Sequence, residues 1–204
     1  MPAVQIVILA KSVKHGQHCV AGKCIDTGRW YRPVSTPEGA ELNNTQVMYK
    51  NIHGTYSVKP LQKIQMGFLN HAPLIHQPDN YLIDSSIWQQ KYKINLDELN
   101  NYFDQPDSIW GEGNRVSYEL IKSKKVNIEQ SLYLVQVKEL KLYYNQDRRR
   151  RASFIYNKID YDFAVTDPNF DKVMCENSDL KGVICISLGE EYNGFCYKLI
   201  ATIF

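Results

Sequence analysis

The sequence has little net charge, few cysteines and no long apolar run, and each shortage excludes a class of protein. The formal net charge is only +2 over 204 residues, so a polyanion could bind at a local basic patch but not over the whole surface. The apolar run VQIVILA at residues 4–10 is too short to span a bilayer and lacks a preceding basic region, and no other run approaches membrane length. We therefore expect neither a signal peptide nor a membrane partner.

The 5 cysteines form an odd set without a C-x-x-C pair, which is typical of reduced thiols, so we expect a cytoplasmic protein. His15, His18, Cys19 and Cys24 lie close together. Zinc sites, however, combine two close pairs across a long gap, and no second pair follows. On a strand, the adjacent His18 and Cys19 would also point to opposite faces. We expect no metal and no cofactor.

Sequence motifs of catalysis and of phosphate binding are missing as well. We find no G-x-S-x-G, no H-E-x-x-H, no P-loop spacing and no dinucleotide fingerprint, so no catalytic residue is assigned. The glycines of VAGKC at residues 20–24 and of GEGN at residues 111–114 are interpreted as turns. Asp160 and Asp162 would share one strand face, which the alternation identifies as the solvent side of a hairpin.

Strand signals dominate what the sequence does contain. Hydrophobic residues make up 44% of the chain and 14 residues are tyrosines, which are frequent in strands. Around Val137 the apolar face of one long pattern changes sides, so we expect a bend or bulge there. Asn157 and Lys158 fit the two-residue turn of a hairpin. The patterns predict strands at residues 4–10, 17–25, 29–35, 61–69, 131–144, 152–165, 181–188 and 194–204.

One helix is predicted in the polar middle of the chain. Asn95 fits an N-cap and Glu98 completes a capping box, while Pro106 limits the helix on its C-terminal side. Strands before and after this segment suggest closed barrels, because closure removes exposed sheet edges. We predict a mostly β protein with small barrels at residues 1–83 and 115–204 and a short helical connector at residues 84–114.

Two mixtures of basic and aromatic residues could bind nucleic acid. Four adjacent arginines, 148–151, can neutralise several phosphates, and nearby tyrosines can stack on bases. The N-terminal mixture includes Trp30 and Arg32, which share a strand face, so either both line a binding surface or both help to close the barrel. The selected binding residues are Lys11, Lys14, His15, Arg29, Trp30, Arg32, Tyr144, Arg148, Arg149, Arg150 and Arg151.

The segment KSVKHGQHCVAGKCIDTGRWYRPVS at residues 11–35 is similar to the opening signature of the prokaryotic dual OB-containing domain family. The likeness continues at SLYLVQVKELKLYY, RASFIYNKIDYDFAVTDPNF and SLGEEYNGFCYKLIATIF, so it covers nearly the whole chain. The resemblance implies two oligonucleotide-binding (OB) type barrels and a nucleic-acid-binding role, with a bacterial defence or conflict system as one setting. It supplies no catalytic residues, and the same fold hosts oligosaccharide and small-ligand binders.

Four functions stay open at this point. The leading one is non-enzymatic binding of single-stranded or structured nucleic acid, with DNA and RNA undecided. The second is a sensor for a nucleotide or modified base, in which Arg32 meets a phosphate and Trp30 stacks on the base. The third is an enzyme acting on nucleic acid through His15, Lys14 or Cys19. The fourth is a protein-interaction module, which keeps a protein partner open.

Overall fold

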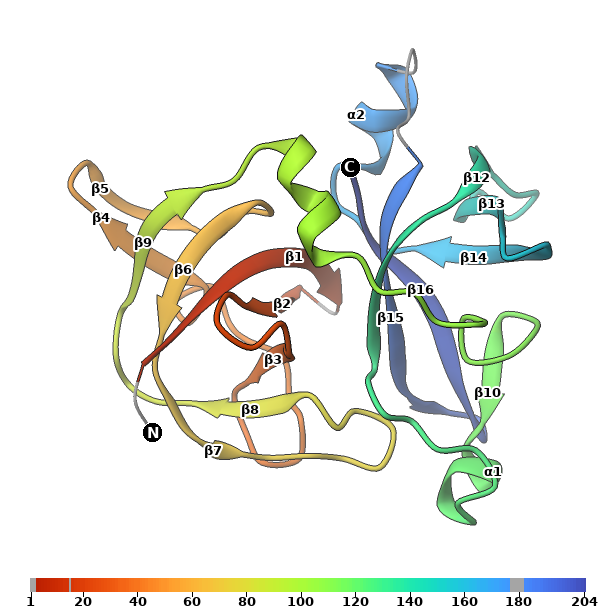
Figure 1. Cartoon of the computed structure of the whole chain (residues 1–204), viewed down its shortest axis with the longest axis horizontal. Coiled ribbons are helices and arrows are strands. Elements are labelled where there is room, and N and C mark those ends of the chain that lie inside the picture. Colours follow the sequence, from red (N-terminus) through yellow and green to blue (C-terminus); the bar gives the residue numbers. More distant parts are fainter. Residues whose placement is uncertain (1–2, 15, 177–181) are drawn as a thin grey trace. The chain divides into compact units, whose positions relative to one another are not determined.

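The structure is a computed structural model that describes residues 3–14, 16–176 and 182–204. The chain divides into two compact units. Unit 1 consists of Met1–Leu74 and Pro78–Tyr102, and unit 2 consists of Ile75–Gln77 and Phe103–Phe204. In Figure 1, unit 1 runs from red to green and unit 2, apart from the short segment Ile75–Gln77, from green to blue.

Unit 1 is built on a nine-stranded sheet with the strand order β5-β4-β9-β6-β1-β2-β3-β8-β7. The long strand β1 pairs with β2 on one side and with β6 on the other. The sheet curves around a core that includes Ile6, Ile8, Ile64 and Trp88. The strands are β1 (Val4–Lys14), β2 (Gln17–Cys24), β3 (Trp30–Val34), β4 (Met48–Asn51), β5 (Gly54–Ser57), β6 (Gln62–Met66), β7 (Phe68–His71), β8 (Asn80–Ile83) and β9 (Trp88–Lys93).

The pairing of β1 with β2 depends on a close approach at Gly22. This residue pairs with Ile8 on one side and with Tyr31 on the other. A Cβ atom at Gly22 would lie 2.0 Å from the carbonyl oxygen of Val7, so a side chain does not fit. The prediction of a turn at Gly22 is therefore wrong: the glycine lies inside a strand, where it lets two backbones approach.

The predicted helix is present as the short 3-10 helix η1 (Leu96–Tyr102). The Oε1 atom of Glu98 accepts a hydrogen bond from the backbone N–H of Asn95 at 2.8 Å, as expected for half of a capping box. The residues just before it form β9, which pairs with β4 and β6. The segment predicted as a helical connector thus also contributes a strand to unit 1. The boundaries at residues 83 and 115 stay predictions about independent folding.

Unit 2 contains a sheet with the strand order β11-β15-β16-β14-β13-β12, and β10 pairs with β16 beside this path. Two short helices, α1 and α2, lie at opposite ends of the long strands β15 and β16 (Figure 1). The elements are β10 (Arg115–Ser117), α1 (Tyr118–Lys122), β11 (Leu132–Gln136), β12 (Lys138–Tyr144), β13 (Arg150–Tyr156), β14 (Ile159–Val165), α2 (Phe170–Cys175), β15 (Val183–Tyr192) and β16 (Phe195–Ile203).

The bend predicted near Val137 is present. Strand β11 ends at Gln136, β12 begins at Lys138, and Glu139 has a φ of +52°. The first piece pairs with β15 and the second with β13. The two halves of this bent segment, β11 and β12, are therefore the two edge strands of the sheet, and the bend curves the sheet in the manner of a barrel. Within the described residues no strand pairing closes the barrel.

Alternation along β13 and β14 gives unit 2 a buried face and an outer face. Asn157 and Lys158, with φ values of +47° and +68°, form the predicted hairpin turn between these strands. The buried face holds alternate residues of both strands, which are Ala152, Phe154, Tyr156, Tyr161, Phe163 and Val165.

The predicted mostly β fold is confirmed, since strands make up most of the regular structure in both units. The five cysteines are free thiols, and three of them, Cys24, Cys185 and Cys196, are buried. No helix in the described part of the chain combines the length and the apolar character needed to cross a membrane.

Candidate nucleic-acid interface

The block of four arginines is divided by the start of β13. Arg150 and Arg151 are consecutive strand residues, so their side chains point to opposite faces. The Nε atom of Arg151 donates to Asp162 Oδ1 at 2.7 Å. The Nη2 atom of Arg150 donates to Asp171 at 2.5 Å, and its guanidinium lies 5.6 Å from the centre of the Phe170 ring. Both guanidinium groups therefore form ion pairs with carboxylates of unit 2.

Arg148 and Arg149 precede the strand, and their side chains are exposed. Asn145 holds the turn: its carbonyl oxygen accepts the N–H of Arg148 at 2.9 Å, and its Oδ1 accepts the N–H of Arg149 at 2.8 Å. Among the described residues, neither guanidinium has an ion-pair or hydrogen-bond partner. We call Asn145–Arg149 the arginine turn. Its two planar guanidinium groups can each bind a phosphate in a bidentate way.

Tyr143 and Tyr144 lie just before the arginine turn and face different ways. The hydroxyl of Tyr144 donates to Asp171, and its ring packs edge-on against Phe170 at 5.4 Å. The hydroxyl of Tyr143 donates to Asp162, and this hydrogen bond raises the pKa of Tyr143. Tyr144, selected from the sequence as a binding residue, thus anchors α2, whereas Tyr143 shares the face of Arg151.

Tyr143 belongs to a row of side chains that crosses the sheet of unit 2. Direct cross-strand partners share a face, and Tyr143 pairs with Arg151, Arg151 with Ala164, and Ala164 with Leu199. Tyr197 lies two residues before Leu199 on β16, so it points to the same face. We call the face that carries these five residues the outer face of unit 2.

Next to Tyr197, the outer face carries an aromatic cluster that the sequence analysis missed. Tyr192 and Phe195 are cross-strand partners at the tip of the last hairpin. The guanidinium of Arg115 lies 4.0 Å from the ring centre of Phe195 and 5.9 Å from that of Tyr197. Tyr192 is 66% exposed. We call Arg115, Tyr192, Phe195 and Tyr197 the aromatic cluster. Its rings and planar guanidinium are groups on which unpaired bases stack.

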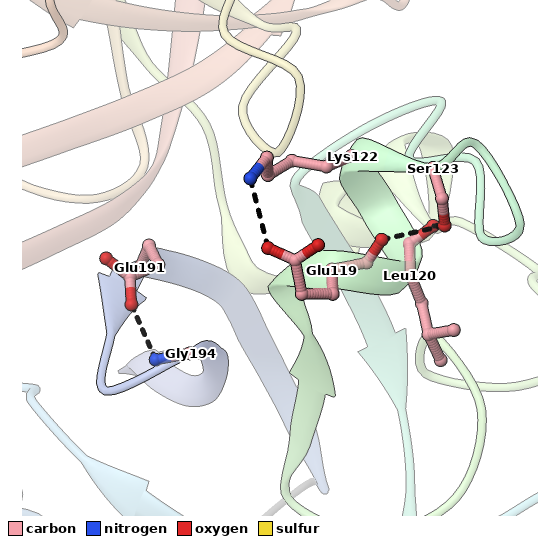
Figure 2. A network of polar contacts seen from close by, with 6 residues as sticks. All are labelled: Glu119, Leu120, Lys122, Ser123, Glu191 and Gly194. Atoms are coloured by element: carbon pink, nitrogen blue, oxygen red, sulfur yellow. Dashed lines mark hydrogen bonds and ion pairs between the residues drawn. The ribbon is translucent and has the colours of Figure 1, made fainter.

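The turn between β15 and β16 is an Asn-Gly pair, the sequence signal that could have revealed this cluster. Asn193 and Gly194 have φ values of +51° and +81°. Figure 2 shows Glu191, whose Oε1 accepts the N–H of Gly194 at 2.6 Å. In the same view, Glu119 of α1 accepts a hydrogen bond from Lys122 at 3.0 Å. Both carboxylates are thus tied to local donors.

Lys11 and Lys14, the N-terminal lysines predicted to bind nucleic acid, both belong to β1. Lys11 is half-buried, and its Nζ donates to Ser57 Oγ at 2.7 Å and to the carbonyl oxygen of Val58 at 2.6 Å. Burial, followed by the charge of Lys59, lowers the pKa of Lys11. Lys14 ends β1, and His15 lies outside the described residues.

Trp30 and Arg32 are both buried, with exposed fractions of 4% and 8%. The Nζ atom of Lys23 lies 5.2 Å from the Trp30 ring centre and donates to the carbonyl oxygen of Tyr102 at 2.8 Å. The backbone N–H of Arg32 donates to the carbonyl oxygen of Asp79 at 2.8 Å. Burial favours the alternative in which both side chains help to close unit 1, and we leave them out of the interface.

Arg29 is exposed, and Tyr31 begins a ladder of rings inside unit 1. Tyr31 stacks on Tyr81 with ring centres 4.1 Å apart, and Tyr81 lies 4.6 Å from His71. Burial, together with the neighbouring Tyr81, raises the pKa of Tyr31 to about 12. The Tyr31 ring therefore already stacks on another ring of unit 1.

A buried lysine supports the loop that leads into the aromatic cluster. The Nζ atom of Lys198 donates to the carbonyl oxygens of Gly111, Glu112 and Gly113 at 2.7, 3.0 and 2.9 Å. Lys198 is 1% exposed, and burial lowers its pKa to about 8. The three donors of one ammonium group thus fix the glycine-rich bend two residues before Arg115.

No group of three or more His, Cys, Asp or Glu side chains in the described residues could hold a metal ion. Unit 1 has an open cavity of about 640 Å³ near the end of β3. The lining includes the carboxylate of Asp84 but neither lysine nor arginine, so it suits a neutral polar ligand better than a phosphate. It is formed by Ser35, Thr45, Gln46, Met48, Thr55, Ile83, Asp84, Ser85, Ser86, Ile87 and Trp88.

The fold defines a mostly β protein of two units, and unit 2 carries the exposed arginine turn before β13 and the aromatic cluster at the β15–β16 hairpin. The chain belongs to the Dual OB-containing domain family, whose pattern it matches over residues 4–203. One matching solved structure is the tetrameric p202 HIN2, with 8% identity, a TM-score of 0.31, and coverage of 98% of this chain and 87% of that chain. Another is a murine DNA binding protein bound with ds DNA, with 12% identity, a TM-score of 0.31, and coverage of 98% and 94%. No curated protein matches the chain.

Proposed function

We propose that the protein binds single-stranded nucleic acid, without catalysis, through the arginine turn and the outer face of unit 2. The arginine turn carries this proposal, because Arg148 and Arg149 are exposed and their guanidinium groups have no ion pair or hydrogen bond with a described residue, so that the turn keeps a net charge of +1 beside Asp147. The aromatic cluster supports it, because it sets an exposed tyrosine beside a guanidinium stacked on a ring. Phosphates would bind at the arginine turn and bases would stack on the cluster.

The positions of the arginine turn and of the aromatic cluster in the fold also support the proposal. OB folds bind oligonucleotides on the face of their second and third strands and on the loops that join strands 1 to 2 and 4 to 5. We take the bent segment β11–β12 as the first strand, followed by β13, β14, β15 and β16. The arginine turn is then the loop between strands 1 and 2, and Tyr192 lies at the loop between strands 4 and 5.

The double variant Arg148→Ala/Arg149→Ala tests this interface. Each neutralised phosphate of a single strand contributes about 0.7 to the slope of log affinity against log salt, so the slope should become shallower by about 1.4. At low salt, we expect the affinity to fall by roughly tenfold. Fluorescence anisotropy of a labelled oligonucleotide, titrated at several salt concentrations, measures both quantities.

A matched control removes the same number of charges elsewhere on unit 2. Lys124 and Lys125 are adjacent and exposed, and Lys124 has a φ of +58°, close to the +55° of Arg148. Lys124→Ala/Lys125→Ala should leave the salt slope near that of the wild type. An unchanged slope in the arginine variant, or an equal change in this control, contradicts the proposal.

A second candidate function is the binding of a nucleoside or modified base, favoured by the polar cavity of unit 1. The lining of hydroxyl groups around Asp84 suits hydrogen bonds to a base or sugar. Saturable one-to-one calorimetric binding of a nucleoside, lost when Ser85→Trp fills the cavity, would favour this candidate over the first.

The biological setting is part of the same proposal. The family resemblance implies a bacterial defence or conflict system, and the reduced cysteines favour the cytoplasm.

A further inference from the structure

Four neighbouring strands of unit 1 contain no acidic residue, and three of them, β4, β9 and β6, carry lysines. Strands β5, β4, β9 and β6 lie side by side, and their sequences are GTYS, MYKN, WQQKYK and QKIQM. Within the described residues, none of their lysines takes part in an ion pair. The four lysines are Lys50, Lys63, Lys91 and Lys93.

The strand register brings three of these lysines to one side of the sheet. Lys50 and Gln65 both pair with Gln89, so Lys63, two residues before Gln65, lies on the same side as Gln89. A register shift between Lys63 and Ile64 brings Tyr92 opposite Lys63 on this side. The Nζ atom of Lys91 donates to Gln89 Oε1 at 3.3 Å, so Lys91 lies on the same side as Gln89. Alternate residues of the same strands point into the core, as shown by the burial of Tyr49, Ile64 and Trp88.

An exposed ring and a polar hollow accompany these charges. Tyr92 is 54% exposed, and the Nζ atom of Lys63 lies 5.4 Å from its ring centre. A hollow of about 520 Å³ lies beside Lys50 and Lys91, and two residues of its lining are joined by a hydrogen bond of 3.0 Å from Asn51 Nδ2 to Gln90 Oε1. Carboxamides of this kind can bond to base edges, which carry both donors and acceptors. The lining comprises Lys50, Asn51, Ile52, Gln89, Gln90 and Lys91.

We infer that these residues form a second nucleic-acid-binding surface, which takes the phosphates and an unpaired base of a single-stranded oligonucleotide. We call Lys50, Lys63, Lys91 and Tyr92 the lysine face. The lysines would contact phosphate oxygens and the Tyr92 ring would stack on a base. This inference extends the proposed function to unit 1 and uses no residue of unit 2.

Charge complementarity favours this occupant over an apolar one. The acidic residue that precedes β9, Asp84, already accepts hydrogen bonds from the backbone N–H and the hydroxyl of Ser86. After β9, the carboxylate of Glu98 accepts the N–H of Asn95. An approaching phosphate would meet lysines and carboxamides on β4, β9 and β6, since Asp84, Asp97 and Glu98 lie outside these strands.

The double variant Lys50→Ala/Lys91→Ala tests the lysine face in the full chain. We expect roughly tenfold weaker binding of a labelled single-stranded oligonucleotide at low salt and a slope shallower by about 1.4. Both side chains are exposed, so the melting temperature should stay near the wild-type value. Lys59→Ala, at another exposed lysine of unit 1, should change binding less than Lys91→Ala alone.

The tyrosine gives a separate test of stacking. Tyr92→Ala should weaken binding by roughly fivefold or more, whereas Tyr92→Phe keeps the ring and should bind like the wild type. If an acidic peptide of equal charge competes as well as the oligonucleotide, and Tyr92→Ala has no effect, the face binds anions in general and the inference is wrong.

The proposals for the two surfaces can be contradicted independently of each other. Wild-type binding by Lys50→Ala/Lys91→Ala overturns the lysine face, while weaker binding by Arg148→Ala/Arg149→Ala would still support the proposed function. The reverse pattern overturns the outer face of unit 2 and supports the lysine face. If the wild-type chain fails to bind any oligonucleotide at low salt, both are overturned.

Discussion

Lys198 shows how one residue fixes a loop of the candidate interface. A buried ammonium group is costly unless acceptors surround it. Here three loop carbonyl oxygens accept its hydrogen bonds, and the rings of Tyr161 and Phe163 lie 5.5 and 5.9 Å from its Nζ. The loop geometry before Arg115 therefore depends on a residue in the core of unit 2.

This arrangement predicts a pH dependence of stability. Burial lowers the pKa of Lys198 from 10.5 to about 8 in the folded state. Between these values the unfolded chain binds more protons, so this residue makes the free energy of unfolding rise with pH, by up to about 1.4 kcal/mol per pH unit. Below the folded pKa, both states carry the proton and the contribution is constant.

Urea unfolding of the wild type and of Lys198→Met across this pH range measures the effect. The difference in free energy of unfolding between them should change with pH between about 8 and 10.5, because only the wild type has this titrating group. Tyrosines titrate in both proteins and cancel from the difference. A difference that is constant over the range would contradict the pKa assigned to Lys198.

The arginine block shows what sequence alone can predict at the residue scale. The sequence alone predicts all four arginines as binding residues, because adjacent charges of one type cannot be distinguished by pattern. The structure divides them through partners distant in the chain: Asp162 lies 11 residues from Arg151, and Asp171 lies 21 residues from Arg150. Which arginines stay exposed depends on strand pairing and on the position of α2.

At the scale of elements, the β1–β2 pair depends on Gly22. A Cβ atom there would clash with the backbone carbonyl of Val7, which belongs to the neighbouring strand and cannot move alone. We expect Gly22→Ala to lower the free energy of unfolding by more than about 2 kcal/mol. Thermal or urea unfolding of the purified variant measures this loss.

Gly28 provides the matched comparison. It has a φ of +68°, but a Cβ atom there would meet nothing within 4 Å. Gly28→Ala should therefore lose only about 1 kcal/mol, from backbone conformation alone. Equal losses of unfolding free energy in the two variants would show that the close approach of Gly22 to Val7 does not determine the stability of the β1–β2 pair.

Sequence patterns predicted the apolar elements better than the polar ones. The bend near Val137 and the hairpin turn at Asn157 and Lys158 are present as expected, because apolar alternation and turn chemistry are local signals. Strand β9 was missed because WQQKYK has no clear alternation. Its strand state depends on pairing with β4 and β6, which lie far away in sequence.

At the scale of the whole molecule, neither unit is strongly basic. Unit 1 has ten Lys and Arg against seven Asp and Glu, a net charge of +3, and unit 2 has fourteen against fifteen, a net charge of −1. Together they give the +2 of the chain. Binding of nucleic acid would thus depend on local groups, namely the arginine turn, the aromatic cluster and the lysine face.

The measurement that tests the central claim most directly is a titration of the wild-type chain with a labelled single strand and the matching duplex at several salt concentrations. We predict saturable binding of the single strand, with a slope of log affinity against log salt of about −2 or steeper. The duplex should bind more weakly, because its bases cannot stack on Tyr192 or Tyr92. Absence of binding at low salt, or an affinity that does not change with salt, would contradict the account.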